Sequence, residues 1–252
     1  MSAPASSRTV PTSFLRTHKR LVIGAVAVLV IAAVVGGGYG LWYVLIGPSS
    51  PGSVTAAFPA DAVVAAPASL DGTWNVNRTL GSIDAGTSSF AGYRVQEQLV
   101  GVGGHTAVGR TPRISGSMTL TGAVVTNVQM TADLTALKSD QDNRDNQLKR
   151  QAIETDLFPT ATFKTTQPID LGTLPADGKI VSVNATGDFT LHGVTRTVTI
   201  ALEAARQGGI IAVAGSLPIV FADYSIQKPS SFSVLSVDDH GTMELHLLFT
   251  HA

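Results

Sequence analysis

Residues 179–191 read KIVSVNATGDFTL, and this stretch contains the pattern that decides the fold. Apolar side chains occupy one set of alternate positions, namely Val181, Val183, Ala185, Phe189 and Leu191. Polar side chains occupy the positions between them, namely Ser182, Asn184, Thr186 and Asp188. A period of two places successive side chains on opposite faces of a β-strand. The segment is therefore predicted to be a strand with one buried face and one solvated face.

The same alternation recurs through most of the chain after residue 70. It is clear in residues 124–134 and 242–250. Further strands are expected at 73–77, 87–99, 113–121, 161–167, 195–204, 209–217 and 231–237. About eight half-apolar antiparallel strands must bury one face, and closing the sheet removes its exposed edges. The prediction is an all-β antiparallel barrel or a tight sandwich, whose interior is filled by side chains or holds one small ligand.

One segment interrupts the strands. Residues 139–153 read SDQDNRDNQLKRQAI. Ser139 is followed three residues later by Asp142, which predicts a capping box, and Leu148 and Ala152 have helical spacing. A short helix inserted between strands is expected here.

A long apolar run precedes the strands. Residues 21–46 read LVIGAVAVLVIAAVVGGGYGLWYVLI, 26 residues without a charge. A helix needs about 20 apolar residues to span the hydrocarbon of a bilayer. A cleaved signal peptide is the alternative, although its apolar region usually runs about 7–15 residues. The run predicts a single transmembrane helix.

The orientation of this helix follows from the basic residues around it. Four of them, Arg8, Arg16, Lys19 and Arg20, precede the run, and the first charge after it is Asp61. Because Lys and Arg are retained on the cytoplasmic side, residues 1–20 are expected to be a cytoplasmic tail. Residues 47–70, rich in Pro, Ala and Ser, are expected to be a flexible linker. Residues 71–252 are then an extracytoplasmic domain held at the cell membrane.

The composition limits the classes of partner. After residue 20 the chain carries 13 basic and 18 acidic residues. This acidic balance, without a basic stripe, argues against nucleic acid as a partner. The sequence has no Cys, which excludes disulfides, thiolate metal sites and a Cys nucleophile. The oligomeric state stays open.

Three ordered blocks of the sequence form a recognisable set. The first is Thr73-Trp74-Asn75-Val76. The second comprises Asp142, Arg144, Asp145, Leu148, Phe158-Pro159 and Ala161-Thr162-Phe163. The third is Gly187-Asp188-Phe189-Thr190-Leu191-His192-Gly193-Val194-Thr195-Arg196. Together these blocks resemble the YceI-like family of lipid-binding domains, although Gln147 stands where many members of the family have His.

The resemblance implies a lipocalin-like β-barrel whose long interior takes a polyisoprenoid chain. We expect a membrane-anchored lipid-binding protein that needs no cofactor, with an isoprenoid lipid or a quinone as the bound molecule. Side chains expected in the lumen are Met118, Met130, Phe163, Val183, Ala185 and Phe189. The alternative is a structural or interaction domain of the cell envelope, in which the same side chains fill the barrel.

A charged group in the second block has two interpretations. Arg144, with Asp142 and Asp145, could meet a lipid headgroup at the mouth of the barrel, since the Arg fork suits phosphate. Alternatively, these charges pin the short helix against the barrel. The structural interpretation is favoured, because Arg and Asp this close usually satisfy each other first.

The sequence gives no positive case for an enzyme or a metal protein. We find no G-x-S-x-G, no H-E-x-x-H and no P-loop, so no catalytic residue is assigned. The six His residues are dispersed without the spacing of a metal-ligand set, so no metal site is predicted.

Overall fold

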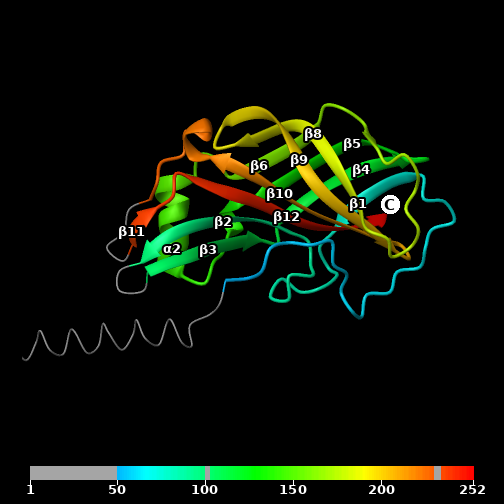
Figure 1. The fold of residues 1–252 in the computed structure, drawn as a ribbon, viewed down its shortest axis with the longest axis horizontal. Helices are drawn as coiled ribbons and strands as arrows, with labels where there is room; N and C mark the ends of the chain where they lie inside the picture. The colour runs from blue at the N-terminus through cyan, green and yellow to red at the C-terminus, as the bar shows by residue number, and fades with distance from the viewer. Residues whose placement is uncertain (1–49, 100–102, 230–233) are drawn as a thin grey trace, which may run out of the picture. The chain divides into compact units, whose positions relative to one another are not determined.

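The computed structural model describes residues 50–99, 103–229 and 234–252 (Figure 1). Within these ranges the chain forms twelve strands. Their bounds are β1 Gly72–Asn77, β2 Phe90–Leu99, β3 Gly103–Thr111, β4 Ile114–Thr121, β5 Val124–Asp133, β6 Thr160–Thr165, β7 Ile169–Asp170, β8 Val181–Leu191, β9 Val194–Gln207, β10 Ile210–Val220, β11 Val234–Val237 and β12 His240–His251. A short helix, α2 Asp142–Gln147, continues through a wider turn, Leu148–Ala152.

Eight of the described strands form a closed antiparallel ring. Its order is β1, β4, β5, β6, β8, β9, β10 and β12, and β12 pairs back with β1. Trp74 of β1 shows the closure, because it is paired with Met118 of β4 on one side and His251 of β12 on the other. The prediction of an antiparallel barrel of about eight strands with one short inserted helix is thus confirmed.

The remaining strands extend the ring at its edges. β2 pairs with the first half of β12, β3 and β11 flank β2, and β7 pairs with β5. Figure 1 shows α2 beside β2 and β3. Residues 103–111 were not among the expected strands, because the glycines of β3 weaken the alternating pattern.

Tight turns fix the register of neighbouring ring strands. β8 and β9 are joined by His192 and Gly193, with Leu191 paired to Val194. Both turn residues have positive φ, 51° and 73°. Two consecutive positive φ values define the type I′ turn, whose twist suits a two-residue hairpin. The register set here keeps the odd-numbered side chains of β8 on the inner face.

A segment before β1 covers part of the outer face of the barrel. Ala56 packs with Ile210, Ala212 and Leu248, side chains of β10 and β12 that point away from the lumen. The ring of buried His246 lies between two backbone oxygens, with Nε2 3.0 Å from that of Ala57 and Nδ1 2.8 Å from that of Ser88. Residues 54–64, assigned by composition to a flexible linker, are therefore packed against the barrel at specific contacts.

The described part of the chain contains no helix long and apolar enough to cross a membrane. The predicted cytoplasmic tail, 1–20, and the predicted transmembrane helix, 21–46, lie outside the described residues.

We expect Ala56→Asp to release the covering segment. Ala56 is 6% exposed, and a carboxylate there would have to be buried without a partner or displace the segment. The free energy of unfolding should fall by about 2 kcal/mol, measured by denaturant unfolding. Limited proteolysis should also cut residues 50–66 faster. Val63→Asp is the matched control, because Val63 is 93% exposed. Equal stability of the two variants would mean that the contacts around Ala56 contribute little.

Candidate functional site

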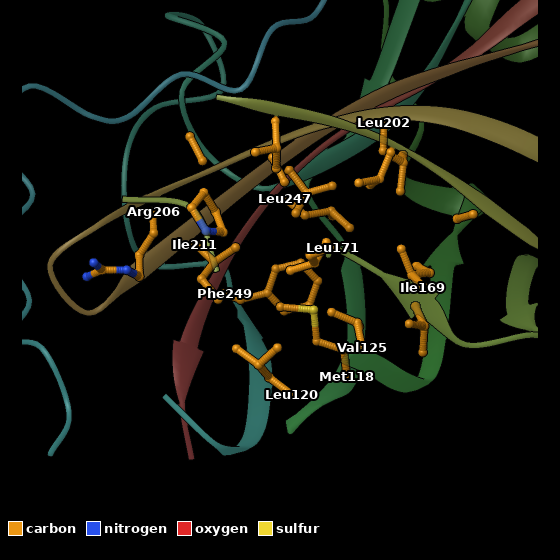
Figure 2. A pocket seen from close by; sticks show the side chains of 18 of the residues that line it. Met118, Leu120, Val125, Ile169, Leu171, Leu202, Arg206, Ile211, Leu247 and Phe249 are labelled. Carbon is orange, nitrogen blue, oxygen red and sulfur yellow. The ribbon is translucent and has the colours of Figure 1, made fainter. Parts of the chain in front are cut away.

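The barrel contains a partly open apolar cavity of about 120 Å³. Its walls come from β4, β5, β6, β8, β9, β10 and β12, with Leu70 and residues from the segment 169–175 closing the remainder. Figure 2 shows Met118, Leu120, Val125, Leu247 and Phe249 among the lining side chains. Protein interiors are packed about as densely as organic crystals, with few voids larger than a water molecule. A cavity of this size means that the barrel is not completely filled by its own side chains.

Strand alternation explains why this lining is apolar. On β8, Val183 and Ala185 face the cavity, whereas Asn184 between them is exposed. Ala185 is 1% exposed and is paired with Ile200 of β9, which also lines the cavity. Each pair of adjacent strands therefore contributes apolar side chains at the same level of the barrel.

The structure gathers most of the predicted lumen residues around this cavity. Met118, Met130, Phe163, Val183 and Ala185 all line it. Phe189 is buried in the same hydrophobic core but belongs to another part of it. Its ring packs edge-on against that of Tyr224, with the centroids 5.7 Å apart. Phe189 therefore packs in the core beyond the cavity.

Several lining residues were not predicted. Leu171, Leu174 and Pro175 belong to the segment between β7 and β8, which has no strand alternation. Leu70 was assigned to the linker, but the indole N–H of fully buried Trp74 donates a 2.9 Å hydrogen bond to its backbone oxygen. A Trp in the first strand indicates that its indole N–H will find a buried acceptor, but the sequence does not identify Leu70 as that acceptor.

Arg206 is the charged member of the lining among the described residues. It is the last inward residue of β9, and Figure 2 shows its guanidinium directed away from the cluster of apolar side chains. Its Nη1 donates to the backbone oxygen of Gly208 at 3.0 Å and lies 2.8 Å from Oδ1 of Asp177. One end of the cavity thus carries a cation, while the rest of its described wall is apolar.

The predicted polar site at the barrel mouth is not at this cavity, since Asp142, Arg144 and Asp145 are absent from its lining. Arg144 donates to the carboxylates of Glu97 on β2 and Asp140. The expected pairing of Arg144 with Asp142 and Asp145 is therefore wrong. The ion pair with Glu97 links α2 to β2, which agrees with the structural interpretation, whereas Asp140 lies just before α2.

The predicted capping box is also wrong. Helix α2 begins at Asp142 with Gln141 as its N-cap, and no side chain caps it. The Ser139 hydroxyl instead donates to Oδ1 of buried Asp145 at 2.7 Å, and the Ser139 N–H donates to the same oxygen at 2.9 Å. Asp142 is exposed, with Oδ1 3.9 Å from Nζ of Lys138. Ser139 therefore binds the carboxylate of Asp145, which is about one helical turn after Asp142, the residue that the motif predicts.

Glu97 is the central residue of this group, and sequence reasoning missed it. It is 5% exposed and contacts both Arg144 and Nδ1 of His105, the latter at 3.1 Å. Tyr93 is buried nearby, and burial raises the pKa of its hydroxyl. Both residues belong to the inward set of β2, which is otherwise apolar. A charged residue on the apolar face of an alternating strand was the available signal.

Phe158 of the second resemblance block and His192 of the third meet outside the cavity, although Phe163 of the second block lines it. The Phe158 ring packs edge-on against that of buried His192, with the centroids 4.4 Å apart. His192 Nδ1 lies 3.0 Å from the Tyr224 backbone oxygen, and its Nε2 lies 3.0 Å from the Glu154 carboxylate. A Cβ at Gly193 would approach Phe158 to 2.7 Å, so the small residue is required by packing as well as by its φ. These motif residues build the barrel end.

A family model described as the YceI-like domain matches residues 82–249. The chain belongs to the YceI-like family. The match begins before β2 and ends within β12, so β1, which closes the ring, precedes the matched YceI-like residues.

Curated relatives of the chain carry the name UPF0312 protein. That of Vibrio parahaemolyticus is 31% identical over 120 residues, which are 45% of this chain and 60% of the relative. That of Vibrio vulnificus is 32% identical over 130 residues, 48% of this chain and 60% of the relative. The matched segment therefore spans about 60% of the length of these relatives.

Solved structures share the fold. A polyisoprenoid binding domain from Saccharophagus degradans, implicated in plant cell wall breakdown, superposes with a TM-score of 0.51 and 19% identity, covering 65% of this chain and 94% of that one. BcnA from Burkholderia cenocepacia superposes with a TM-score of 0.50 and 22% identity, covering 64% and 94%. At these identities the similarity is one of fold.

We expect Arg144→Met to destabilise the barrel without emptying it. Removing one partner of a buried ion pair leaves Glu97 without its strongest donor, at a cost of roughly 3 kcal/mol in the free energy of unfolding. Adding Glu97→Gln should recover part of this loss. Asp142→Asn, which alters an exposed pair, should change stability by less than about 0.5 kcal/mol. Unchanged stability of Arg144→Met together with loss of bound lipid would favour the headgroup interpretation instead.

Proposed function

We propose that the chain is a lipid-binding protein that holds an isoprenoid-type apolar chain in its barrel. The observation that carries this proposal is the apolar cavity of about 120 Å³ inside the barrel. An engineered apolar cavity of about 150 Å³ in another protein stays dry and binds benzene. Burying each CH₂ contributes about 0.8 kcal/mol, so a chain of several carbons binds such a lumen without specific polar chemistry.

The lining has a feature that suits a long chain. Met118 and Met130 are unbranched and adopt many rotamers, so they can move to lengthen the cavity for a larger guest. The small side chain of Ala185, which also lines the cavity, occupies little of the lumen. The ligand class is supported further by the shared fold with the polyisoprenoid binding domain of Saccharophagus degradans.

The alternatives account for less of the structure. A structural domain with a side-chain-filled barrel gives no reason for an unfilled apolar space. An enzyme would need a nucleophile, acid or base at the cavity, and Arg206 is the one charged side chain among the described residues that line it. A binding protein rather than a catalyst is therefore the function that the cavity favours.

We further propose that the barrel is held at the outer surface of the cell membrane by residues 21–46. This rests on the 26-residue uncharged run and on the four basic residues before it. An extracytoplasmic barrel close to the bilayer could exchange an isoprenoid lipid or quinone with it.

The topology predicts the result of protease treatment of intact spheroplasts. The domain from residue 71 onward should be degraded, whereas a cytoplasmic marker protein should survive. Protection of the domain in intact spheroplasts, with degradation after lysis, would reverse the orientation.

Ala185→Phe tests the binding proposal directly. The added ring should occupy the cavity, leaving the domain folded because the space is already there. The amount of lipid that copurifies after mild detergent extraction should fall roughly tenfold, which corresponds to excluding about two CH₂ groups. Native mass spectrometry measures this amount, and thermal unfolding checks the fold.

Asn184→Phe is the matched control, because Asn184 is next to Ala185 in the sequence but its side chain is exposed on the outer face. It should keep the lipid. If Ala185→Phe unfolds and the wild type carries no lipid, the interior is already full and the structural alternative is correct, since overfilling a packed core typically costs about 1–3 kcal/mol.

A further inference from the structure

Arg206, the cation at one end of the cavity, has N–H donors that make no hydrogen bond to the described residues. Among the described residues, one nitrogen of Arg206 is paired: Nη1, with the Gly208 backbone oxygen and the Asp177 carboxylate. Its Nε is buried and has no hydrogen-bond partner. A guanidinium presents five N–H donors, so the contacts to Asp177 and Gly208 leave most of them unused.

The unused N–H donors of Arg206 lie on one edge of the guanidinium. Nε and Nη2 lie along the side edge of the planar guanidinium, and their N–H bonds point in parallel. This edge matches two oxygens of a phosphate or carboxylate in a bidentate arrangement. Asp177 holds the other edge, through Nη1, and so fixes the plane of the group. The free edge is thereby positioned before any ligand arrives.

Arg206 lies between the apolar cavity and the solvent. Its side chain is 20% exposed, and its stem contributes to the cavity wall. Asp177 is 55% exposed on the loop between β7 and β8, and this loop also supplies Leu174 and Pro175 to the cavity lining. Arg206 therefore stands where the apolar lumen meets the solvent. A buried donor such as Nε is unfavourable until an acceptor reaches it.

We propose that Arg206 binds an anionic head, a phosphate or a carboxylate, on the ligand whose apolar chain occupies the cavity. This inference rests on the proposed function and adds the chemical class of the head. The ligand is then an amphiphile: the chain contacts the apolar wall, and two oxygens of the head accept from Nε and Nη2 of Arg206. Arg144, the cation that the sequence suggested for this role, already pairs with two carboxylates and does not line the cavity.

The test compares two probes that share one chain and differ in the head, farnesyl phosphate and farnesol. Equilibrium binding of the radiolabelled probes is measured on the full-length chain in lipid nanodiscs, with empty nanodiscs subtracting partition into the bilayer. The wild type should prefer farnesyl phosphate by about tenfold or more, as expected for charge-assisted hydrogen bonds. Arg206→Met, which keeps the apolar stem, should abolish the preference by weakening the binding of farnesyl phosphate far more than that of farnesol.

Three further variants sharpen the result. Arg206→Lys keeps the charge but loses the fork, so it should retain only part of the preference. Asp177→Asn keeps an oxygen that can accept from Nη1 but removes the negative charge beside the guanidinium, so it should tighten the binding of farnesyl phosphate. This variant keeps the test valid if Arg206→Met does not fold. Arg196→Met is the control, because Arg196 is also on β9 but is exposed and pairs with Asp223.

The outcomes separate the two proposals. An undiminished preference in Arg206→Met, weaker phosphate binding in Asp177→Asn, or a wild type that favours farnesol would overturn the role of Arg206. Failure of the wild type to bind either probe would overturn the binding function itself.

Discussion

The pairing of β1 with β12 is the constraint on which the rest of the structure depends. It joins the first and last ring strands, from Trp74 opposite His251 to Asn77 opposite Leu248. Without it, β1 and the end of β12 that pairs with β1 would each present a free edge, and the inner face would be open to water there. Because the ring is closed, the inward-facing side chains form one continuous core, and part of this core lines the cavity. Trp74 sits at this seam and also fixes Leu70 on the cavity wall.

The last strand is buried on both of its faces. Leu247 and Phe249 line the cavity, whereas His246 and Leu248 lie on the outer face beneath residues 54–64. All four positions are therefore buried, so burial along β12 does not alternate there even though side-chain direction does. The two faces serve different purposes, since the inner face bounds an unfilled cavity and the outer face is covered by the chain itself.

The sequence predicted the features that follow from alternation alone, namely the positions of most strands and the faces of their side chains. The inner face of β8 could be read directly, because Val183 and Ala185 alternate with Asn184, and the cavity lining agrees. Alternation did not predict β3, because glycines interrupt the pattern there. It also did not predict the packing of the segment around Ala56, because that segment is buried against an outer face formed by strands distant in the sequence. Long-range polar contacts were also out of reach. Arg144 was expected to pair within its own helix, but Glu97, far away in the sequence, is its buried partner.

The same limit explains why the polar end of the cavity was not predicted. Arg206 follows the apolar positions of β9 in an ordinary alternating strand, and its cationic role at the rim arises only when the β9–β10 turn and the loop carrying Asp177 come together. Motifs that carry the family resemblance pointed elsewhere, because Phe158 and His192 build the barrel end rather than the lumen. Most residues of the resemblance blocks therefore lie away from the cavity, and Phe163 is the one that lines it among the described residues.

The central claim is that an apolar chain lies inside the closed barrel. Methyl NOE spectroscopy of the full-length chain with bound farnesol tests it most directly, because β12 supplies an internal control. We predict intermolecular NOEs from the farnesol chain to the methyl groups of Val183, Leu202 and Leu247, which line the cavity. The methyl groups of Ala212 and Leu248, on the covered outer face, should show none. NOEs confined to the outer-face methyl groups, or no saturable NOEs to the lumen, would contradict the account.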